Sequence, residues 1–210
     1  MIKFCKKILN LLLLLLFVSC ISHKIPETQF YVFTGNSEWT KQEKDLCYIA
    51  ISNFKNIDST KVILKKTNIP CQGQAQPLLR TIFKKPKKRT YVIKVQDCNH
   101  KNPLCFSVLP DSAKIGLIGH ELAHIIDYKT KNFFQITATG VKYSLSKKYK
   151  TKLEYQTDSI TIINNMGSEK LIFYKFITNS SFADDKYLRR IHKYYMNSED
   201  ITRIMRNSSK

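Results

Sequence analysis

Hydrophobic and polar positions divide the chain into two parts. In the first part, apolar residues form short runs between turn-forming residues, a pattern typical of β-strands. The segment 69–77, rich in Gln, Pro and Gly, predicts a loop, and the basic segment 84–89 predicts a turn between two paired strands. The strands are expected at 30–33, 61–64, 78–83, 90–95 and, as an edge strand ended by Pro110, 106–109.

In the second part, apolar residues recur with the period of a helix. Those in 115–125 lie on one face of a helix that Asp111 or Ser112 caps and that ends near Thr130. A second helix, over 151–166, is expected to end with Gly167 just after its last residue. Other helices are expected at 40–54, where Thr40 and Glu43 have capping-box spacing, and at 168–177, 185–196 and 199–206. Strands followed by helices predict a single α+β domain.

The first twenty residues have the composition of an export signal. Three Lys precede an apolar run of about ten residues, which is too short to span a bilayer stably because that takes roughly 20 apolar residues. Residues 17–20 resemble the lipobox of bacterial lipoproteins, in which the Cys is acylated and becomes the first mature residue. Ser19 is the small residue before Cys20, and Phe17 stands where that motif usually has Leu.

The lipobox resemblance divides the chain into a signal peptide over 1–19, a lipidated tether over 20–28 and a single domain over 29–210. It implies an exported protein whose lipidated Cys20 anchors it to the periplasmic or surface face of a bacterial membrane. The alternative is an ordinary signal peptide in which Cys20 is incidental.

Composition and charge exclude several other classes of protein. Of the 210 residues, 43% are hydrophobic, which excludes an intrinsically disordered chain, and 6 Gly and 6 Pro exclude a collagen-like one. The formal charge of +19 falls to +16 when the three Lys of 1–19 are removed. The basic runs 84–89 and 147–152 either attract anionic lipid headgroups or are simply solvated. The sequence has no nucleic-acid-binding module with base-stacking aromatics, so we expect no nucleic-acid partner.

Four cysteines remain once the leader and Cys20 are set aside. An even set in an exported protein predicts two disulfides, with three possible connectivities. Cys98 and Cys105 are the natural local pair, which leaves Cys47 and Cys71 for the second bridge. A zinc–thiolate site is not favoured, because no Cys-x-x-Cys pair occurs and the compartment is oxidising.

The chemically most specific pattern is His-Glu-Leu-Ala-His at 120–124, in the middle of an expected helix. Residues four apart lie on one helix face, so His120 and His124 can bind one Zn²⁺ through neutral imidazoles. Glu121 lies beside the first ligand and can act as general base on a metal-bound water. Asp127 lies on the same side as His120, where it either orients a ligand or faces solvent.

The next helix offers a third ligand, because Glu154 and Asp158 are again four residues apart. The segment 115–165 resembles the gluzincin class of zinc metallopeptidases, whose pattern is H-E-x-x-H followed on a later helix by E-x-x-x-D. The resemblance implies that His120, His124 and Glu154 bind zinc, that Glu121 is the base and that Asp158 steadies a ligating His. It also implies a zincin-like fold, with a small N-terminal sheet and a helical C-terminal half that carries the metal site.

Residue chemistry alone leaves other third ligands open, namely Asp127, His100 and His192. His100 lies inside the loop that Cys98 and Cys105 would close, where an exposed side chain is expected. His192 is either a surface residue or one that approaches the site and stabilises an oxyanion. His23 lies beside the lipid anchor and is set aside.

These patterns predict a membrane-anchored zinc metallopeptidase, a hydrolase with one Zn²⁺ that cleaves peptide or protein substrates through a zinc-activated water. The expected edge strand 106–109 would bind an extended substrate by strand addition. Two alternatives remain. One is a non-catalytic envelope lipoprotein that acts as a binding module, and the other is a zinc hydrolase of non-peptide amides with the same site.

Overall fold

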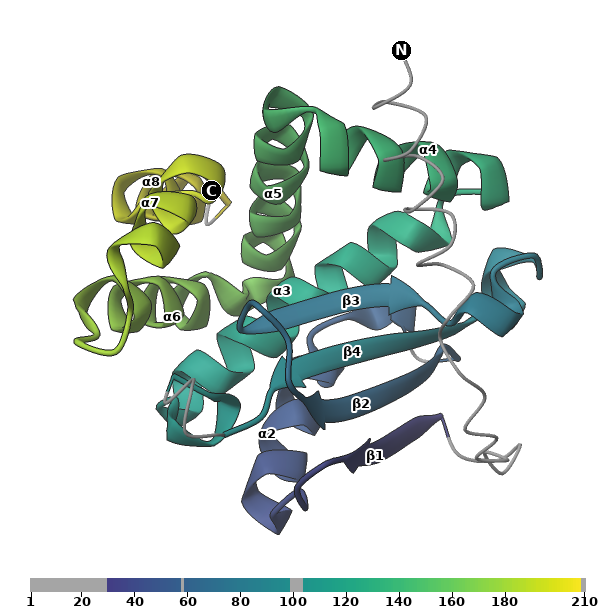
Figure 1. Cartoon of the computed structure of the whole chain (residues 1–210), viewed down its shortest axis with the longest axis horizontal. Helices are drawn as coiled ribbons and strands as arrows, with labels where there is room; N and C mark the ends of the chain where they lie inside the picture. Colours follow the sequence, from purple (N-terminus) through teal and green to yellow (C-terminus); the bar gives the residue numbers. More distant parts are fainter. Residues whose placement is uncertain (1–29, 58, 99–103, 209–210) are drawn as a thin grey trace, which may run out of the picture.

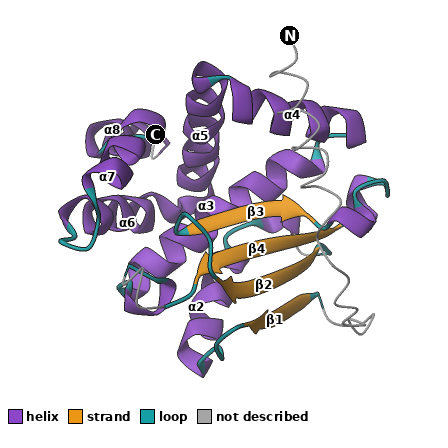
Figure 2. Ribbon diagram, viewed as in Figure 1, coloured by secondary structure: helices purple, strands orange, loops and turns teal. Residues whose placement is uncertain are grey.

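The computed structural model describes residues 30–57, 59–98 and 104–208. The expected signal peptide, the tether with Cys20 and His23, and His100 lie outside the described residues. The described part has a four-stranded sheet followed along the chain by helices, which confirms the mixed α+β class (Figures 1 and 2). Within it, every helix is too short or too polar to cross a membrane.

The sheet has the strand order β1-β2-β4-β3. Three strands are parallel, namely β1 (Tyr31–Gly35), β2 (Lys61–Thr67) and β4 (Thr90–Gln96). β3 (Gly73–Pro77) runs antiparallel to β4 and forms one edge of the sheet. Along β2, buried and half-buried residues alternate because successive side chains point to opposite faces.

The predicted pairing of 78–83 with β4 is wrong. The antiparallel partner of β4 is β3, which comes from the segment predicted to be a loop. Residues 79–81 form a short 3-10 helix. The hydroxyl of its last residue, Thr81, donates to the carbonyl of Leu78, the residue before the helix. β3 has few apolar side chains and is held by its backbone pairing, and an edge position tolerates Pro77. Its hydrophobic pattern therefore gave no strand signal.

The predicted edge strand 106–109 is also wrong. Phe106–Val108 forms a 3-10 helix, and the Phe106 ring is buried against Trp39 with 5.4 Å between ring centroids. The next helix, α3 (Asp111–Lys129), follows Pro110, which occupies the capping position with no side-chain hydrogen bond. The prediction that Asp111 or Ser112 caps this helix is therefore incorrect, although the helix itself and its length are confirmed.

α3 is the central helix of the molecule. Twelve of its 19 residues are buried, and it packs against β3, α2 (Lys41–Ser52) and α6 (Gly167–Asn179). Gly116 permits the close contact with α6, because a Cβ there would lie 2.3 Å from the Glu169 carbonyl oxygen. At the other end, Arg89 is buried and donates from Nη1 to the Lys131 carbonyl at 2.6 Å. Part of the basic run 84–89 thus fixes the C-terminal end of α3.

The helical half departs from the prediction in two places. α4 (Phe133–Leu145) has no counterpart among the predicted helices, although Asn132 and Gln135 form a capping box before it. α5 (Lys147–Thr161) ends in a π-helical turn, Ile162–Met166, so the predicted helix 151–166 is two elements.

Gly167 begins α6 and does not terminate the preceding helix, contrary to the prediction. Its missing side chain makes room for Met205, whose Cγ would lie 2.5 Å from a Cβ at this position. Met205 belongs to α8 (Ser198–Ser208), which with α7 (Asp185–Tyr194) confirms the two helices predicted at the end of the chain.

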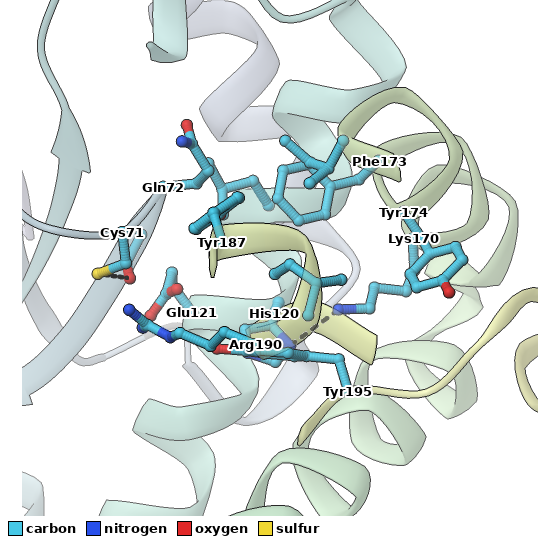
Figure 3. A pocket seen from close by; sticks show the side chains of 14 residues that line it. Cys71, Gln72, His120, Glu121, Lys170, Phe173, Tyr174, Tyr187, Arg190 and Tyr195 are labelled. Carbon is cyan, nitrogen blue, oxygen red and sulfur yellow. Dashed lines mark hydrogen bonds between the residues drawn. The ribbon is translucent and has the colours of Figure 1, made fainter. Parts of the chain in front are cut away.

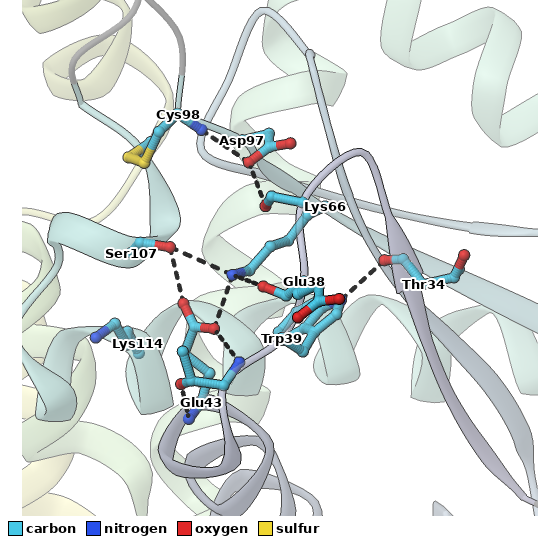
Figure 4. A network of polar contacts seen from close by, with 12 residues as sticks. Thr34, Glu38, Trp39, Glu43, Lys66, Asp97, Cys98, Ser107 and Lys114 are labelled. Carbon is cyan, nitrogen blue, oxygen red and sulfur yellow. Dashed lines mark hydrogen bonds and ion pairs between the residues drawn. A yellow bond between two sulfur atoms is a disulfide. The ribbon is translucent and has the colours of Figure 1, made fainter.

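One of the two predicted disulfides is present. Cys98–Cys105 is confirmed and connects the end of β4 to the segment before α3 (Figure 4). The predicted Cys47–Cys71 bridge is wrong, because both are free thiols. Cys47 belongs to α2 and is buried in the hydrophobic core of the domain. The Cys71 thiol donates to the Gly73 carbonyl at 3.1 Å.

A buried ion pair lies near the disulfide. The Lys66 ammonium is 2.7 Å from the Glu43 carboxylate, which also accepts from Ser107 at 2.8 Å and from the Thr40 backbone at 2.9 Å (Figure 4). The Thr40–Glu43 capping box predicted for α2 is thereby confirmed. Burial opposes ionisation of Glu43, but these hydrogen bonds outweigh it and lower the pKa of the carboxyl group.

Candidate metal centre

His120, Glu121 and His124 lie in the second half of α3, where the helix is held on several sides. The two imidazole rings project from one face, with 4.9 Å between their centroids. His120 and Glu121 are buried, and the His124 side chain is 12% exposed. The residues of the H-E-x-x-H pattern therefore form an interior cluster and not a solvated helix face.

Glu154 of α5 meets both histidines. Its Oε2 atom lies 3.3 Å from His120 Nε2 and 3.5 Å from His124 Nε2. One ligand atom from each of the three residues lies within 4.8 Å of the other two, and all three are buried. The structure thus brings the three predicted zinc ligands together from two helices.

Each histidine is oriented through its other ring nitrogen. His120 Nδ1 lies 2.8 Å from Asp158 Oδ1, and because a carboxylate only accepts, this nitrogen carries the hydrogen. His124 Nδ1 lies 3.2 Å from the hydroxyl of Thr157, whose own hydrogen is donated to the Leu153 carbonyl at 2.9 Å. Both Nε2 lone pairs are consequently left to face Glu154.

Glu154 is oriented in the same way. The hydroxyl of Tyr143, from α4, donates to Glu154 Oε1. Oε2 is buried and has no hydrogen-bond partner among the described residues, despite its closeness to the two Nε2 atoms. A buried carboxylate oxygen without a partner, facing two imidazole lone pairs, fits a bound cation, and this donor set of two nitrogens and one oxygen suits Zn²⁺.

The charges around the histidines favour a positive centre. Burial and the Lys170 charge oppose protonation of His120, but interactions with Asp158 and Glu154 outweigh them and raise its pKa to about 9. Burial likewise opposes ionisation of Glu154, yet the two imidazoles hold the pKa of Glu154 well below its usual range. The cluster therefore stabilises a cation between the rings, whether a proton or a metal.

Asp158 also binds a buried lysine of α6. Lys170 Nζ lies 2.5 Å from Asp158 Oδ1 and 3.3 Å from His120 Nδ1, and the Met196 backbone donates to Asp158 Oδ2 at 3.1 Å. Burial opposes ionisation of Asp158, but the Lys170 charge and the His120 hydrogen bond lower its pKa. Asp158 is therefore an ionised carboxylate that holds His120 in place.

Glu121 lies beside the edge strand β3. A Cβ on Gly73 would be 2.4 Å from Glu121 Oε1, so a side chain at this position would displace the Glu121 carboxylate. Oε2 is buried without a hydrogen-bond partner in the described part of the chain. Burial raises the pKa of Glu121, although the two nearby histidines act against it. Such a carboxylate can accept and release a proton closer to neutral pH than an exposed one.

A small cavity adjoins Glu121 and His120. Gly73 and Leu117 form part of its wall, and Lys170, Tyr187 and Arg190 come from α6 and α7 (Figure 3). The Tyr195 ring lies near His120, tilted by 52°, with 5.7 Å between ring centroids. The cavity measures about 30 Å³, room for one or two water molecules.

The other predicted site residues lie elsewhere. Asp127 pairs with Lys131 near the end of α3 and contacts neither histidine in the described structure, so its predicted role beside a ligand is not supported. His192 is exposed on α7 beside the Tyr174 ring, so it is neither a third ligand nor a residue of the cavity.

Sequence reasoning did not identify Tyr143, Thr157 or Lys170. Thr157 lies one helical turn after Glu154 and could have been found from that spacing, whereas Tyr143 belongs to the helix that was not predicted. The chain matches no protein-family model, curated protein or solved structure. We infer its function from the residues of the site and their contacts.

Proposed function

We propose that the protein is a zinc metallopeptidase of the gluzincin type that binds one Zn²⁺ through His120, His124 and Glu154. The observation that carries this proposal is the convergence of three buried ligand atoms within 4.8 Å, beside a buried glutamate. Three protein ligands leave a coordination position for water or substrate, as catalytic zinc sites do. The four-stranded sheet followed by helices is compatible with a zincin-like fold, which we propose for the domain.

The residues around the centre have separate tasks. Bound zinc would polarise the substrate carbonyl and lower the pKa of a bound water. Glu121 would accept a proton from the attacking water and pass it to the leaving amine. Asp158 and Thr157 keep the two imidazoles in one tautomer, and Tyr143 restricts Glu154 to one ligating oxygen.

The edge strand β3 is our candidate for substrate binding, in place of 106–109. One side of β3 pairs with β4, and Gly73 places the start of the strand against Glu121. An extended peptide that paired with the other side would carry its carbonyl groups past the metal centre. This geometry favours a peptide over a compact non-peptide amide, because backbone pairing requires an extended main chain.

We also propose that the protein is exported and anchored in the membrane through lipidated Cys20. The residues concerned lie outside the described ones, and the support comes from the Cys98–Cys105 bridge. The Cys98–Cys105 disulfide fits an oxidising compartment such as the cell envelope.

The proposal is tested by zinc stoichiometry and peptide cleavage on three purified proteins. The unchanged protein should bind one equivalent of zinc and cleave members of a peptide library. Glu121→Gln should bind the same zinc and lose cleavage by about 10²–10⁴-fold. Asp127→Asn, outside the site, is the control and should retain both properties.

Three outcomes would contradict the assignment in different ways. Absence of zinc would favour a non-catalytic binding module. Zinc binding with equal cleavage by Glu121→Gln would remove Glu121 as the base. Hydrolysis of small amides but of no peptide would favour the non-peptide alternative.

A further inference from the structure

The proposed active site is almost closed in this structure. His120, Glu121 and Glu154 are 4%, 3% and 1% exposed. The adjoining cavity of about 30 Å³ holds water but not a peptide bond with its flanking residues. A substrate can reach Glu121 only if part of the cavity wall moves.

The wall that faces Glu121 is formed by α7 and the connection between β2 and β3. Arg190 Nη1 donates to the Pro70 carbonyl at 3.3 Å, and Tyr187 interacts with Gln72. Figure 3 shows the Arg190 side chain extending past His120 towards Glu121 and Cys71. Two residues of α7, one turn apart, thus hold this helix against the segment 70–72.

Elsewhere the C-terminal end of α7 contacts α5, where Lys150 Nζ lies 4.6 Å from the centroid of the Tyr194 ring and the Thr151 hydroxyl donates to the Lys193 carbonyl at 3.4 Å. Ile191 is its only buried residue, whereas twelve residues of α3 are buried. A helix of ten residues is marginal in water when it is alone. If α7 leaves its place, its backbone hydrogen bonds are therefore expected to open as well.

The closed arrangement leaves polar atoms unpaired. Gln72 Oε1, Glu121 Oε2 and Arg190 Nε all belong to cavity-lining residues, and none has a hydrogen-bond partner in the described part of the chain. An unpaired buried polar atom is unfavourable, and entry of water or substrate would pair it. These polar atoms therefore have more hydrogen-bond partners when the cavity is occupied than when it is closed and empty.

We propose that α7 is a lid over the metal centre, held shut by Arg190 and Tyr187 on the segment 70–72, and that substrate enters when α7 lifts. Lifting would uncover Glu121 together with the start of β3. The role in substrate entry rests on the proposed function, but the movement of α7 requires neither zinc nor turnover.

Hydrogen exchange measured by mass spectrometry at several urea concentrations tests the lid in the metal-free protein. Amides of α7 should exchange through a local opening that depends little on urea, and amides of α3 through a rarer opening with strong urea dependence. Arg190→Ala should accelerate exchange in α7 by about tenfold, the factor expected when a charge-assisted hydrogen bond is lost. The segment 70–73 should respond with it.

Arg189→Ala is the matched control, because Arg189 is exposed on the same helix and does not line the cavity. Alanine favours helix in both variants, so faster exchange reports loss of docking and not a weaker helix. Equal exchange of α7 in the two variants would overturn the proposal, as would α7 and α3 opening together with the same urea dependence.

A milder variant decides the question if Arg190→Ala does not fold. Tyr187→Phe removes only the hydroxyl that meets Gln72 and should also accelerate exchange in α7 relative to Arg189→Ala. Unchanged exchange in Tyr187→Phe would then overturn the proposal. A protein without zinc or activity would still give a clear result, so failure of the proposed function is distinguishable from failure of the lid.

Discussion

α3 and α7 face the same cavity but are held in different ways. α3 is packed against the sheet, α2 and α6, and Arg89 fixes its C-terminal end. α7 is held by the buried Ile191, by contacts at the cavity and, at its C-terminal end, by Lys150 and Thr151 of α5. The helix that carries the proposed ligands is therefore fixed, and the helix that covers them is not. Metal ligands need positions defined to a fraction of an ångström, whereas substrate access needs movement.

The charged residues follow the same division. Glu154, Asp158 and Lys170 are buried around His120, where Lys170 pairs with Asp158 and both carboxylates contact the imidazole. On α7 most charged side chains are exposed, and their loss should cost little. Removal of a single buried charge should cost more, because its partner then remains buried and unpaired.

Gly116→Ala should give the largest change in stability, because it disrupts the close packing of α3 on α6. The added Cβ would lie 2.3 Å from the Glu169 carbonyl, and the backbone of α6 must move to admit it. We expect the free energy of unfolding in urea to fall by about 2–3 kcal/mol. Gly140→Ala in α4 is the control, because a Cβ there meets nothing within 4 Å, and it should be neutral or stabilising. Equal behaviour of the two variants would contradict the close packing of α3 on α6.

Asp158→Asn should weaken zinc binding while it preserves side-chain size. It removes the carboxylate that orients His120 and leaves Lys170 buried without its anionic partner. The zinc dissociation constant, measured by competition with a chelator, should rise by about 10–100-fold. Asp185→Asn on α7 removes an exposed charge and should leave zinc binding unchanged. Similar affinities for both variants would show that the buried carboxylate does not support the metal ligands.

Acid should lower the free energy of unfolding by protonating Glu43, the partner of the buried Lys66. Its pKa in the folded protein is below the ordinary value of 4.5, so the unfolded chain binds the proton first as pH falls. The stabilisation is complete above pH 4.5 and is lost as pH falls through the lowered pKa. Urea unfolding of the unchanged protein and of Glu43→Gln should show a stability difference that is constant near neutral pH and shrinks in acid. A difference that grows in acid would contradict the sign of this shift.

Asp184→Ala should have the smallest effect and should act mainly on the lid. Asp184 Oδ1 accepts from the Tyr187 backbone at 2.6 Å and caps α7. Loss of the cap should lower the opening free energy of α7 by about 1 kcal/mol, measured by hydrogen exchange. Asp185→Ala, at the next position, removes a similar charge but no cap. The capping assignment fails if both variants exchange at the same rate.

Local spacing explains which parts of the site were predictable. His120, His124, Glu154 and Asp158 are two pairs four residues apart, so each pair shares a helix face before any tertiary structure is known. Tyr143 and Lys170 reach the site through packing of α4 and α6, which no local pattern specifies. The sequence therefore predicted the residues that meet at the candidate metal site but not the residues that hold Glu154 and Asp158.

The errors in the fold have a similar cause. β3 pairs through its backbone, so its side chains carry no alternation that could identify it. The Cys47–Cys71 pairing was predicted only because these two cysteines were left over from an even set of four. The position of Cys47 in the core excludes it. The one capping box that the prediction used, Thr40 with Glu43, is confirmed, and the unused one at Asn132 and Gln135 marks the helix that was missed.

The π-helical turn Ile162–Met166 makes the chain more sensitive to a deletion than to a substitution at the exposed position of the turn. Asn165 has φ 61°, and the turn lets α6 start in a new direction after α5. Each residue of a helix advances by about 100° around its axis. A chain shorter by one residue here would turn Lys170 away from Asp158, whereas the exposed Ile163 can vary in identity. Among proteins that descend from a common ancestor with this one, the length of this turn should therefore be kept more strictly than the identity of its exposed residue 163.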